Sequence, residues 1–186
     1  IYTERRNALR KLMPSGIILL PGNTEAAYNY AANTYTFRQD SNFSYFFGLE
    51  NPDFVGVMDI DNGTDYIFGN DFEIDDVIWM GPQPKVIDLA AKVGVKNTST
   101  LNELGVFLNN AIRKRRPVHF APAYRAETTL QLSNLLGLTP SRIRDYASLP
   151  LIEAIVKLRS IKADIEVAEI EKAIEGKMPE GVSVKK

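Results

Sequence analysis

Apolar residues in the first part of the chain form one helical stripe and then one continuous run. Residues 2–13 place leucines and a methionine on one helical face, and Pro14-Ser15-Gly16 ends the pattern, which predicts a first helix. Ile17–Leu20 is uninterrupted, as expected for a strand buried on both faces. Residues 22–36 are polar and rich in Asn, a pattern that predicts a long surface loop.

A β-hairpin is the clearest local prediction. Residues 53–70 read DFVGVMDIDNGTDYIFGN, two β-rich runs around Asp61-Asn62-Gly63, and Asn-Gly tolerates the positive φ angles of a tight turn. The acidic residues 71–77 that follow are expected to form a short helix or a turn leading to Ile78-Trp79-Met80-Gly81-Pro82.

Helical and strand patterns alternate through the middle of the chain. The expected elements are helices at 86–93, 100–115 and 126–136, a strand at 117–120 and a connector at 140–144. This order predicts an α/β fold, with a mixed β-sheet flanked by helices. From 151 to 174 a helical pattern keeps its apolar residues broadly on one face, and a break at 161–164 predicts two helices in tandem. Residues 176–186, GKMPEGVSVKK, are expected to form a poorly ordered tail.

Composition narrows the class of protein. The 186 residues are 45% hydrophobic and 24% charged, which is ordinary for one globular domain. The net charge of −1 offers no broad basic surface, so neither nucleic acid nor an anionic membrane is an expected partner. No cysteine is present, which excludes thiolate catalysis and disulfides and suits a reducing compartment. No apolar run is long enough to cross a bilayer, and no signal-like pattern opens the sequence, so a cytoplasmic location is expected.

The usual catalytic and binding motifs are not found. Asp59–Gly63 begins like a calcium loop, but positions five, six and twelve of that loop do not match, so the hairpin interpretation is favoured. His119 is the only histidine and is expected to be a partly buried strand residue rather than a metal ligand or a triad member. Neither Gly-rich phosphate motif occurs. The basic cluster Arg113–Arg116 is interpreted as a solvated helix end rather than a nucleic-acid patch.

The most unusual stretch is FRQDSNFSYFFGLEN, residues 37–51, which is either a binding or catalytic site or a way of building the interior. Together with Asn51-Pro52-Asp53 it resembles the signature of the amino-terminal domain of aminopeptidase P, the Xaa-Pro aminopeptidases of the creatinase/prolidase superfamily. Further segments fall in the order of that family over about residues 1–175: Glu4-Arg5-Arg6, Ile17–Leu20, Ile78-Trp79-Met80-Gly81 and Leu158-Arg159-Ser160-Ile161-Lys162, followed by Glu166-Val167 or Glu169-Ile170.

The resemblance implies a division of labour along a longer protein. Residues 1–150 would be the small α/β domain, and residues 151–175 a linker helix toward a "pita-bread" catalytic domain. In the family that second domain holds two divalent metal ions, commonly manganese, on two Asp, one His and two Glu, and a metal-bridging hydroxide attacks the peptide bond before proline. None of those motifs occurs in this chain, so it is expected to be inactive alone, with no catalytic residue and no metal site of its own. Residues 176–186 do not resemble the continuing catalytic domain.

Roles for individual residues follow from the same resemblance. The amino-terminal domain of the family supports oligomer assembly and narrows access to the active site, so the expected partners are the catalytic domain, further copies of the chain and proline-containing peptides. Trp79, with Asp75 and Asp76, is the candidate for substrate access, although a buried position for Trp79 is weighed evenly against an interface contact. The motif residues Arg38, Asp40, Tyr45, Phe46, Gly48 and Pro52 are interpreted as structural, with the aromatics in the core. Arg38 and Asp40 are expected to form an ion pair or a capping set rather than to bind substrate. A stand-alone module that binds a protein or peptide is the alternative function.

Overall fold

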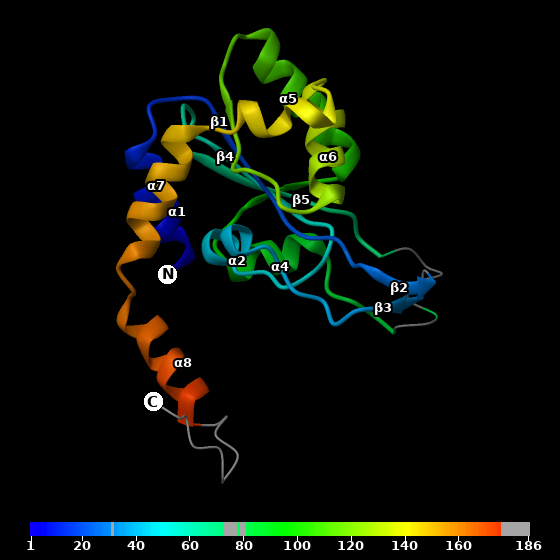
Figure 1. Cartoon of the computed structure of the whole chain (residues 1–186), viewed down its shortest axis with the longest axis vertical. Helices are drawn as coiled ribbons and strands as arrows, with labels where there is room; N and C mark the ends of the chain where they lie inside the picture. Colours follow the sequence, from blue (N-terminus) through cyan, green and yellow to red (C-terminus); the bar gives the residue numbers. More distant parts are fainter. Residues whose placement is uncertain (31, 73–77, 79–80, 176–186) are drawn as a thin grey trace.

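A mixed β-sheet forms the centre of the computed structural model, which describes residues 1–30, 32–72, 78 and 81–175 (Figure 1). Within that part of the chain the main sheet has the strand order β6-β5-β4-β1-β7. β1 pairs with β4 and β4 with β5 in antiparallel fashion, whereas the edge strands β6 and β7 are parallel to their neighbours. The strands are β1 (Ile17–Pro21), β4 (Val55–Asp59), β5 (Thr64–Phe68), β6 (Asn97–Ser99) and β7 (Val118–His119). The predicted α/β fold with a mixed sheet is therefore confirmed.

Helices cover both faces of this sheet (Figure 1). One face packs against α1 (Tyr2–Leu12), α2 (Ser41–Phe47), α4 (Val86–Lys92) and α7 (Leu149–Ser160). The opposite face packs against α5 (Leu101–Arg113), α6 (Ala126–Leu136) and the 3-10 helix η1 (Pro140–Tyr146). The result is a three-layer arrangement in which the sheet is buried from both sides, as its apolar strands require.

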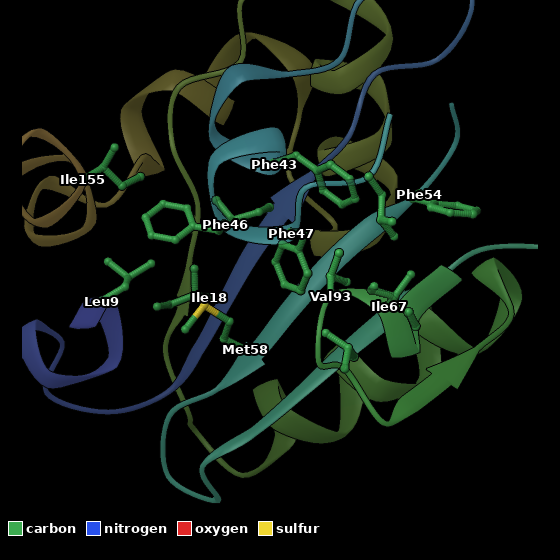
Figure 2. Packing of buried hydrophobic residues seen from close by; sticks show 14 of the residues in the cluster. Leu9, Ile18, Phe43, Phe46, Phe47, Phe54, Met58, Ile67, Val93 and Ile155 are labelled. Carbon is green, nitrogen blue, oxygen red and sulfur yellow. The ribbon is translucent and has the colours of Figure 1, made fainter. Parts of the chain in front are cut away.

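The central strand β1 shows why its sequence is apolar without alternation. Ile18 and Leu20 belong to the hydrophobic cluster under α1, α2 and α7, which Figure 2 shows, whereas Ile17 and Leu19 belong to the cluster under α5 and α6. All four side chains are buried. Because successive strand residues point to opposite faces, a strand between two helical layers needs an apolar residue at every position.

Two glycines follow the ends of helices in the left-handed conformation. Gly137 follows α6 with φ of 65° and ψ of 29°, and its N–H donates to the carbonyl of Ser133. Gly94 follows α4 with φ of 74°. This left-handed conformation is inexpensive only for glycine, so Gly137 ends α6 directly, whereas Gly94 turns the chain one residue after Val93, the residue that caps α4.

Three short strands were not predicted. β2 (Ala27–Tyr30) and β3 (Asn33–Thr34) form an exposed antiparallel hairpin inside the segment expected to be a loop. In Figure 1 this hairpin projects beyond the main sheet. The edge strand β6 was also missed, because it is a short polar segment defined by its parallel pairing with β5 rather than by an apolar pattern. The single surface loop expected over residues 22–36 was therefore wrong in part.

The chain ends its described part with two helices, as expected. α7 stops at Ser160, and α8 (Asp164–Glu175) begins after a short break, with the N–H of Ala163 donating to the Glu166 side chain. α7 buries Leu151 and Ile155, but the apolar residues of α8 are exposed, and α8 extends away from the sheet (Figure 1). The two tandem helices predicted from the sequence are therefore present, but in the described part of the chain only the first of them packs its apolar residues on the sheet. Residues 176–186 lie outside the described part of the chain.

Among the described residues, no helix combines the length and the apolar character needed to cross a bilayer.

Candidate functional site

The unusual segment 37–51 is built around α2, which has a defined start and end. The Asp40 carboxylate accepts hydrogen bonds from the N–H groups of Asn42 and Phe43, at 2.9 and 3.0 Å, and so caps the helix. Gly48 ends it with φ of 62°, and a Cβ atom at this position would overlap the Tyr2 ring. Of the two structural roles expected for Arg38 and Asp40, capping by Asp40 is observed. Arg38 is exposed, and the described part of the chain shows no ion pair between the two.

The aromatic residues of α2 form the interior rather than a site. Phe43, Phe46 and Phe47 have no exposed surface, and they pack on the sheet together with Leu9 and Ile155 (Figure 2). The structural interpretation of these residues fits this position. A Cβ on Gly56 in β4 would overlap the Phe47 ring, so glycine in the strand makes room for the phenyl group.

Tyr45 differs from its neighbours because it lies between two guanidinium groups. Arg5 is centred 3.9 Å and Arg159 5.5 Å from the centre of its ring, and the Tyr45 hydroxyl donates to the carbonyl of Leu158 at 3.2 Å. These contacts connect α1, α2 and α7. A cation–π contact of this kind stabilises a protein by about 0.5–1 kcal/mol when it is exposed. Tyr45 therefore contributes to the packing of all three helices.

Arg6 is a buried arginine that the sequence interpretation missed. Its guanidinium donates to Asp65 Oδ2 at 2.8 Å and to the carbonyls of Phe46 and Val93 at 2.9 Å each. The side chain has no exposed surface. Its spacing from Leu9 and Met13 places it on the apolar face of α1, which was the available signal.

The hairpin turn carries a second ion cluster, between Asp59, Asp61 and Arg116. Asp59 is buried and accepts from Arg116 and from the N–H and side chain of Asn62. Burial acts to raise the pKa of Asp59, but the hydrogen bonds from Arg116 and Asn62 outweigh burial and lower it. The pKa of Arg116 is raised, mainly by its hydrogen bond to Asp59. Burial acts to lower this pKa, and Asp61 acts to raise it further. The prediction of a solvated basic cluster was therefore wrong for Arg116.

Replacing Asp59 by asparagine is expected to lower the free energy of unfolding at pH 7 by about 1.5–3 kcal/mol, because charged hydrogen bonds are lost. The lowered pKa means that this contribution is present above the unfolded carboxyl pKa, near about 3.9, and is lost as pH falls through the folded value. Urea unfolding at pH 7, 5 and 3 should show the difference between wild type and variant shrinking below about pH 4. A difference of equal size at all three pH values would contradict this assignment, and Asp145→Asn, at an exposed pair with Arg142, is the control.

His119 is a half-buried residue of β7, as expected. Its ring nitrogens lie 2.8 Å from Ser148 Oγ and 3.0 Å from the carbonyl oxygen of Ser15. A carbonyl only accepts, so Nε2 must carry a proton. The Ser148 side chain also caps α7 by accepting from the N–H of Leu151. His119 therefore links the start of α7 to strand β7 of the sheet.

A concave acidic surface is lined by residues 51–54 and 70–72, together with Glu25 and Leu101. This acidic hollow has a volume of about 470 Å³, and its lining includes the acidic residues Glu25, Asp53 and Asp71 and the apolar residues Phe54, Phe72 and Leu101. Pro52, one of the motif residues, also lines it. Asn70 and Asp71 fix its edge, because their side chains accept from the N–H groups that open α5 and α4.

The charges in the acidic hollow repel one another. Partial burial and the nearby Glu25 carboxylate raise the pKa of Asp53. Asp53 also holds a left-handed φ of 62°, which is uncommon for a residue other than glycine. A positively charged group placed here would relieve the repulsion between the carboxylates. The apolar side chains of the lining would then contact the carbon atoms beside that group. The hollow is therefore suited to a positively charged group with an apolar neighbour.

Trp79, Asp75 and Asp76, the predicted substrate-access residues, lie outside the described residues. Asp71 and Phe72, at the start of the same acidic segment, are described and line the acidic hollow. In the described part of the chain, no group of three or more His, Cys, Asp or Glu side chains is arranged to hold a metal ion.

Comparisons with known proteins agree on one family. The family described as "Aminopeptidase P, N-terminal domain" matches residues 2–119. A protein of Aspergillus niger named "Probable Xaa-Pro aminopeptidase" is 25% identical over 169 residues, which are 91% of this chain and 33% of that protein. A Penicillium rubens protein, also named "Probable Xaa-Pro aminopeptidase", is 35% identical over 78 residues, which are 41% of this chain and 15% of that protein. The chain thus spans about a third of the first of these curated relatives.

Solved structures show the same fold. A variant of Escherichia coli aminopeptidase P superposes with a TM-score of 0.72 at 22% identity, covering 94% of this chain and 41% of that one. Proline aminopeptidase P II from Yersinia pestis gives 0.74 at 22% identity, covering 94% and 42%. The family match extends over more than half of the chain. This chain therefore belongs to the aminopeptidase P N-terminal domain family.

Proposed function

We propose that this chain is the non-catalytic amino-terminal part of a metal-dependent Xaa-Pro aminopeptidase, where it guides substrate access and supports assembly. The observation that carries the proposal is the family match together with the length of the relatives, since the chain corresponds to only a third of a protein named as an Xaa-Pro aminopeptidase. In this proposal residues 1–150 are the domain, and residues 151–175 lead to a catalytic domain that holds the two metal ions. Manganese is the proposed metal.

The acidic hollow supports the substrate-access role. A peptide substrate of an aminopeptidase presents a free amino group, which is a cation at neutral pH. Glu25 and Asp53 offer negative charge in a concave surface, and Phe54 and Phe72 provide apolar contact beside it. These residues would collect peptides by their amino termini and leave cleavage to the metal centre of the larger protein.

The exposed apolar side of α8 supports the assembly role. Val167, Ile170 and Ile174 follow one another at spacings of three and four, so they share one side of α8, and each is at least 41% exposed on a helix that leaves the body of the domain (Figure 1). Aliphatic residues gathered in this way are characteristic of surfaces that pack against another domain or subunit. In the proposal, α8 packs on the catalytic domain of the same protein, and further contacts join copies of the whole protein into an oligomer.

The test uses the protein encoded by the complete natural reading frame. Its manganese-dependent hydrolysis of a short Xaa-Pro peptide should persist in the double variant Glu25→Gln, Asp53→Asn, with kcat unchanged and KM raised about threefold to tenfold, because two weak ionic contacts are lost. The matched control is Asp145→Asn, an exposed carboxylate of η1, which should leave KM unaltered.

Two outcomes would contradict different parts of the proposal. An unchanged KM in the double variant would remove the substrate-access role of the acidic hollow. A complete protein that lacks the five metal ligands and hydrolyses no Xaa-Pro peptide would overturn the enzyme assignment and favour a stand-alone interaction module.

A further inference from the structure

A second concave surface lies at the root of the β2–β3 hairpin. It has a volume of about 330 Å³ and is lined by Asn23, Tyr35, Phe37, Arg38, Tyr124 and Arg125, among others. We call it the tyrosine–arginine hollow. Its volume is within the range of about 300–1,000 Å³ that is usual for ligand sites. The family motif contributes Phe37 and Arg38 to this surface, and neither residue has a role in the core.

Tyr124 is exposed but held in place. Its side-chain hydroxyl accepts a hydrogen bond from the amide of Asn23 at 3.0 Å, and the same amide donates to the carbonyl of Arg38 at 2.8 Å. Asn23 is buried, whereas Tyr124 is 71% exposed. The phenolic proton of Tyr124 therefore remains available to a ligand. The hydrogen bond from Asn23 holds the exposed Tyr124 ring in place before a ligand arrives. Binding to this ring would therefore cost less conformational entropy.

The residues that flank the β2–β3 hairpin, Ala26 and Tyr35, also line the tyrosine–arginine hollow. The rings of Tyr28 and Tyr35 meet edge to face, with their centres 4.9 Å apart, and both are more than half exposed. The N–H of Tyr35 donates to the carbonyl of Ala26 at 2.9 Å, which holds the two strands together. β2 and β3 form a sheet of their own, so their outer edges carry backbone groups that can pair with an added extended chain.

The charge of the tyrosine–arginine hollow is positive. Among the described residues that line it, Arg38 and Arg125 are basic and none is acidic. Arg125 donates to the carbonyl of Thr24 at 3.2 Å and lies 3.7 Å from Glu127. The Arg38 guanidinium is exposed and makes no hydrogen bond or ion pair with any described residue. Arg38 is therefore free to pair with an external carboxylate.

We propose that the tyrosine–arginine hollow binds an extended acidic peptide segment of a partner protein. The rings of Tyr35 and Tyr124 would contact apolar or prolyl residues of the peptide, and Arg38 would pair with one of its carboxylates. Tyrosine and arginine are among the residues enriched where interfaces gain most of their affinity, and tyrosine in addition buries a large rigid ring at a low cost in entropy. The position is separate from the acidic hollow, whose charge has the opposite sign.

A peptide is favoured over single-stranded nucleic acid, which also binds to arginines and stacked aromatic rings. The whole chain carries a net charge of −1, and the acidic hollow would repel a long polyanion. A short acidic peptide requires only the local charge of Arg38 and Arg125.

The experiment measures fluorescence anisotropy of a labelled hexapeptide of alternating Glu and Pro added to the 186-residue chain. We expect this peptide to bind at least tenfold more tightly than its Gln-Pro and Lys-Pro counterparts. Arg38→Gln should weaken binding about tenfold because a charged contact is lost, and Tyr124→Ala should weaken it to a similar extent. The exposed Arg38 side chain makes no hydrogen bond or ion pair with a described residue, so Arg38→Gln should keep the thermal unfolding midpoint of the parent chain.

Matched controls come from η1, where the Arg142 guanidinium lies 5.5 Å from the centre of the Tyr146 ring. Arg142→Gln and Tyr146→Ala remove an exposed arginine and an exposed tyrosine elsewhere, and both should leave the dissociation constant unchanged. The proposal is overturned if Arg38→Gln binds as the parent chain does, or if the Gln-Pro peptide binds equally well. It is also overturned by the absence of binding at millimolar peptide, or by an oligothymidylate of similar length that binds more tightly.

Discussion

Replacing Arg6 by methionine is expected to lower the free energy of unfolding by about 3–5 kcal/mol, measured by urea denaturation at pH 7. Methionine keeps most of the volume of the side chain but removes every donor. The carbonyls of Phe46 and Val93, each 2.9 Å from the Arg6 guanidinium, then lose their partner inside the protein. A buried acceptor without a donor costs about 1–3 kcal/mol, so these two groups account for most of the expected loss.

The second partner of Asp65 allows the cost of Arg6→Met to be assigned to specific groups. Its carboxylate contacts both Arg6 and Arg10, so Arg6→Met leaves the buried charge with one partner. The predicted cost therefore arises mainly from the two carbonyls and not from an unpaired carboxylate. Arg142→Met is the matched control, because that arginine is paired with Asp145 on an exposed surface and should contribute less than about 1 kcal/mol. Equal losses in the two variants would refute the importance of burial.

Replacing Phe46 by alanine is expected to destabilise the protein by about 3–5 kcal/mol, again measured by urea denaturation. Phe46 has no exposed surface and lies beside Leu9 and Ile155 in the cluster of Figure 2, so truncation leaves a cavity between α1, α2 and α7. Its ring also meets Tyr45 edge to face, with centres 4.9 Å apart. The loss should exceed that from transfer of the missing atoms alone, because the surrounding helices relax only partly.

Phe72→Ala provides the comparison for this second variant. Phe72 is 44% exposed, so its truncation should cost less than about 1 kcal/mol. Phe46→Leu should fall between the two, because leucine fills part of the cavity. A cost for Phe46→Ala no greater than for Phe72→Ala would contradict the placement of α2 in the core.

The elements with a strong apolar period could be predicted from the sequence. Burial requires apolar residues at regular intervals along the sequence. This periodicity is present in α1, α5 and the β4–β5 hairpin, each of which buries one face or both. The hairpin of β2 and β3 is exposed, and a polar segment without a buried face carries no such period. β6 is held by its neighbour β5, which is distant in the sequence.

The candidate sites were harder to predict for a related reason. A helical arginine such as Arg6 is usually solvent-exposed, and only the folded arrangement of Phe46, Asp65 and Val93 around it gives a reason for burial. The tyrosine–arginine hollow joins residues 23–38 to residues 124 and 125, so no local pattern could show it. The cap at Asp40 could be anticipated because it depends on Asn42 and Phe43, which follow it directly in the sequence.

The position of β1 at the centre of the sheet also determines the order in which the chain can fold. β1 pairs along its length with residues 55–59, which are made soon after it, but its other neighbour is residues 118 and 119. During synthesis, the β1–β4–β5 unit can therefore form once β5 is complete at Phe68, while one edge of β1 still awaits β7, which begins at Val118. Sequence-distant pairing of this kind slows folding and leaves a strand edge open to wrong partners in the interval. We therefore expect closure of β7 onto β1 to be the late step of folding, after the hairpin and α2 have packed.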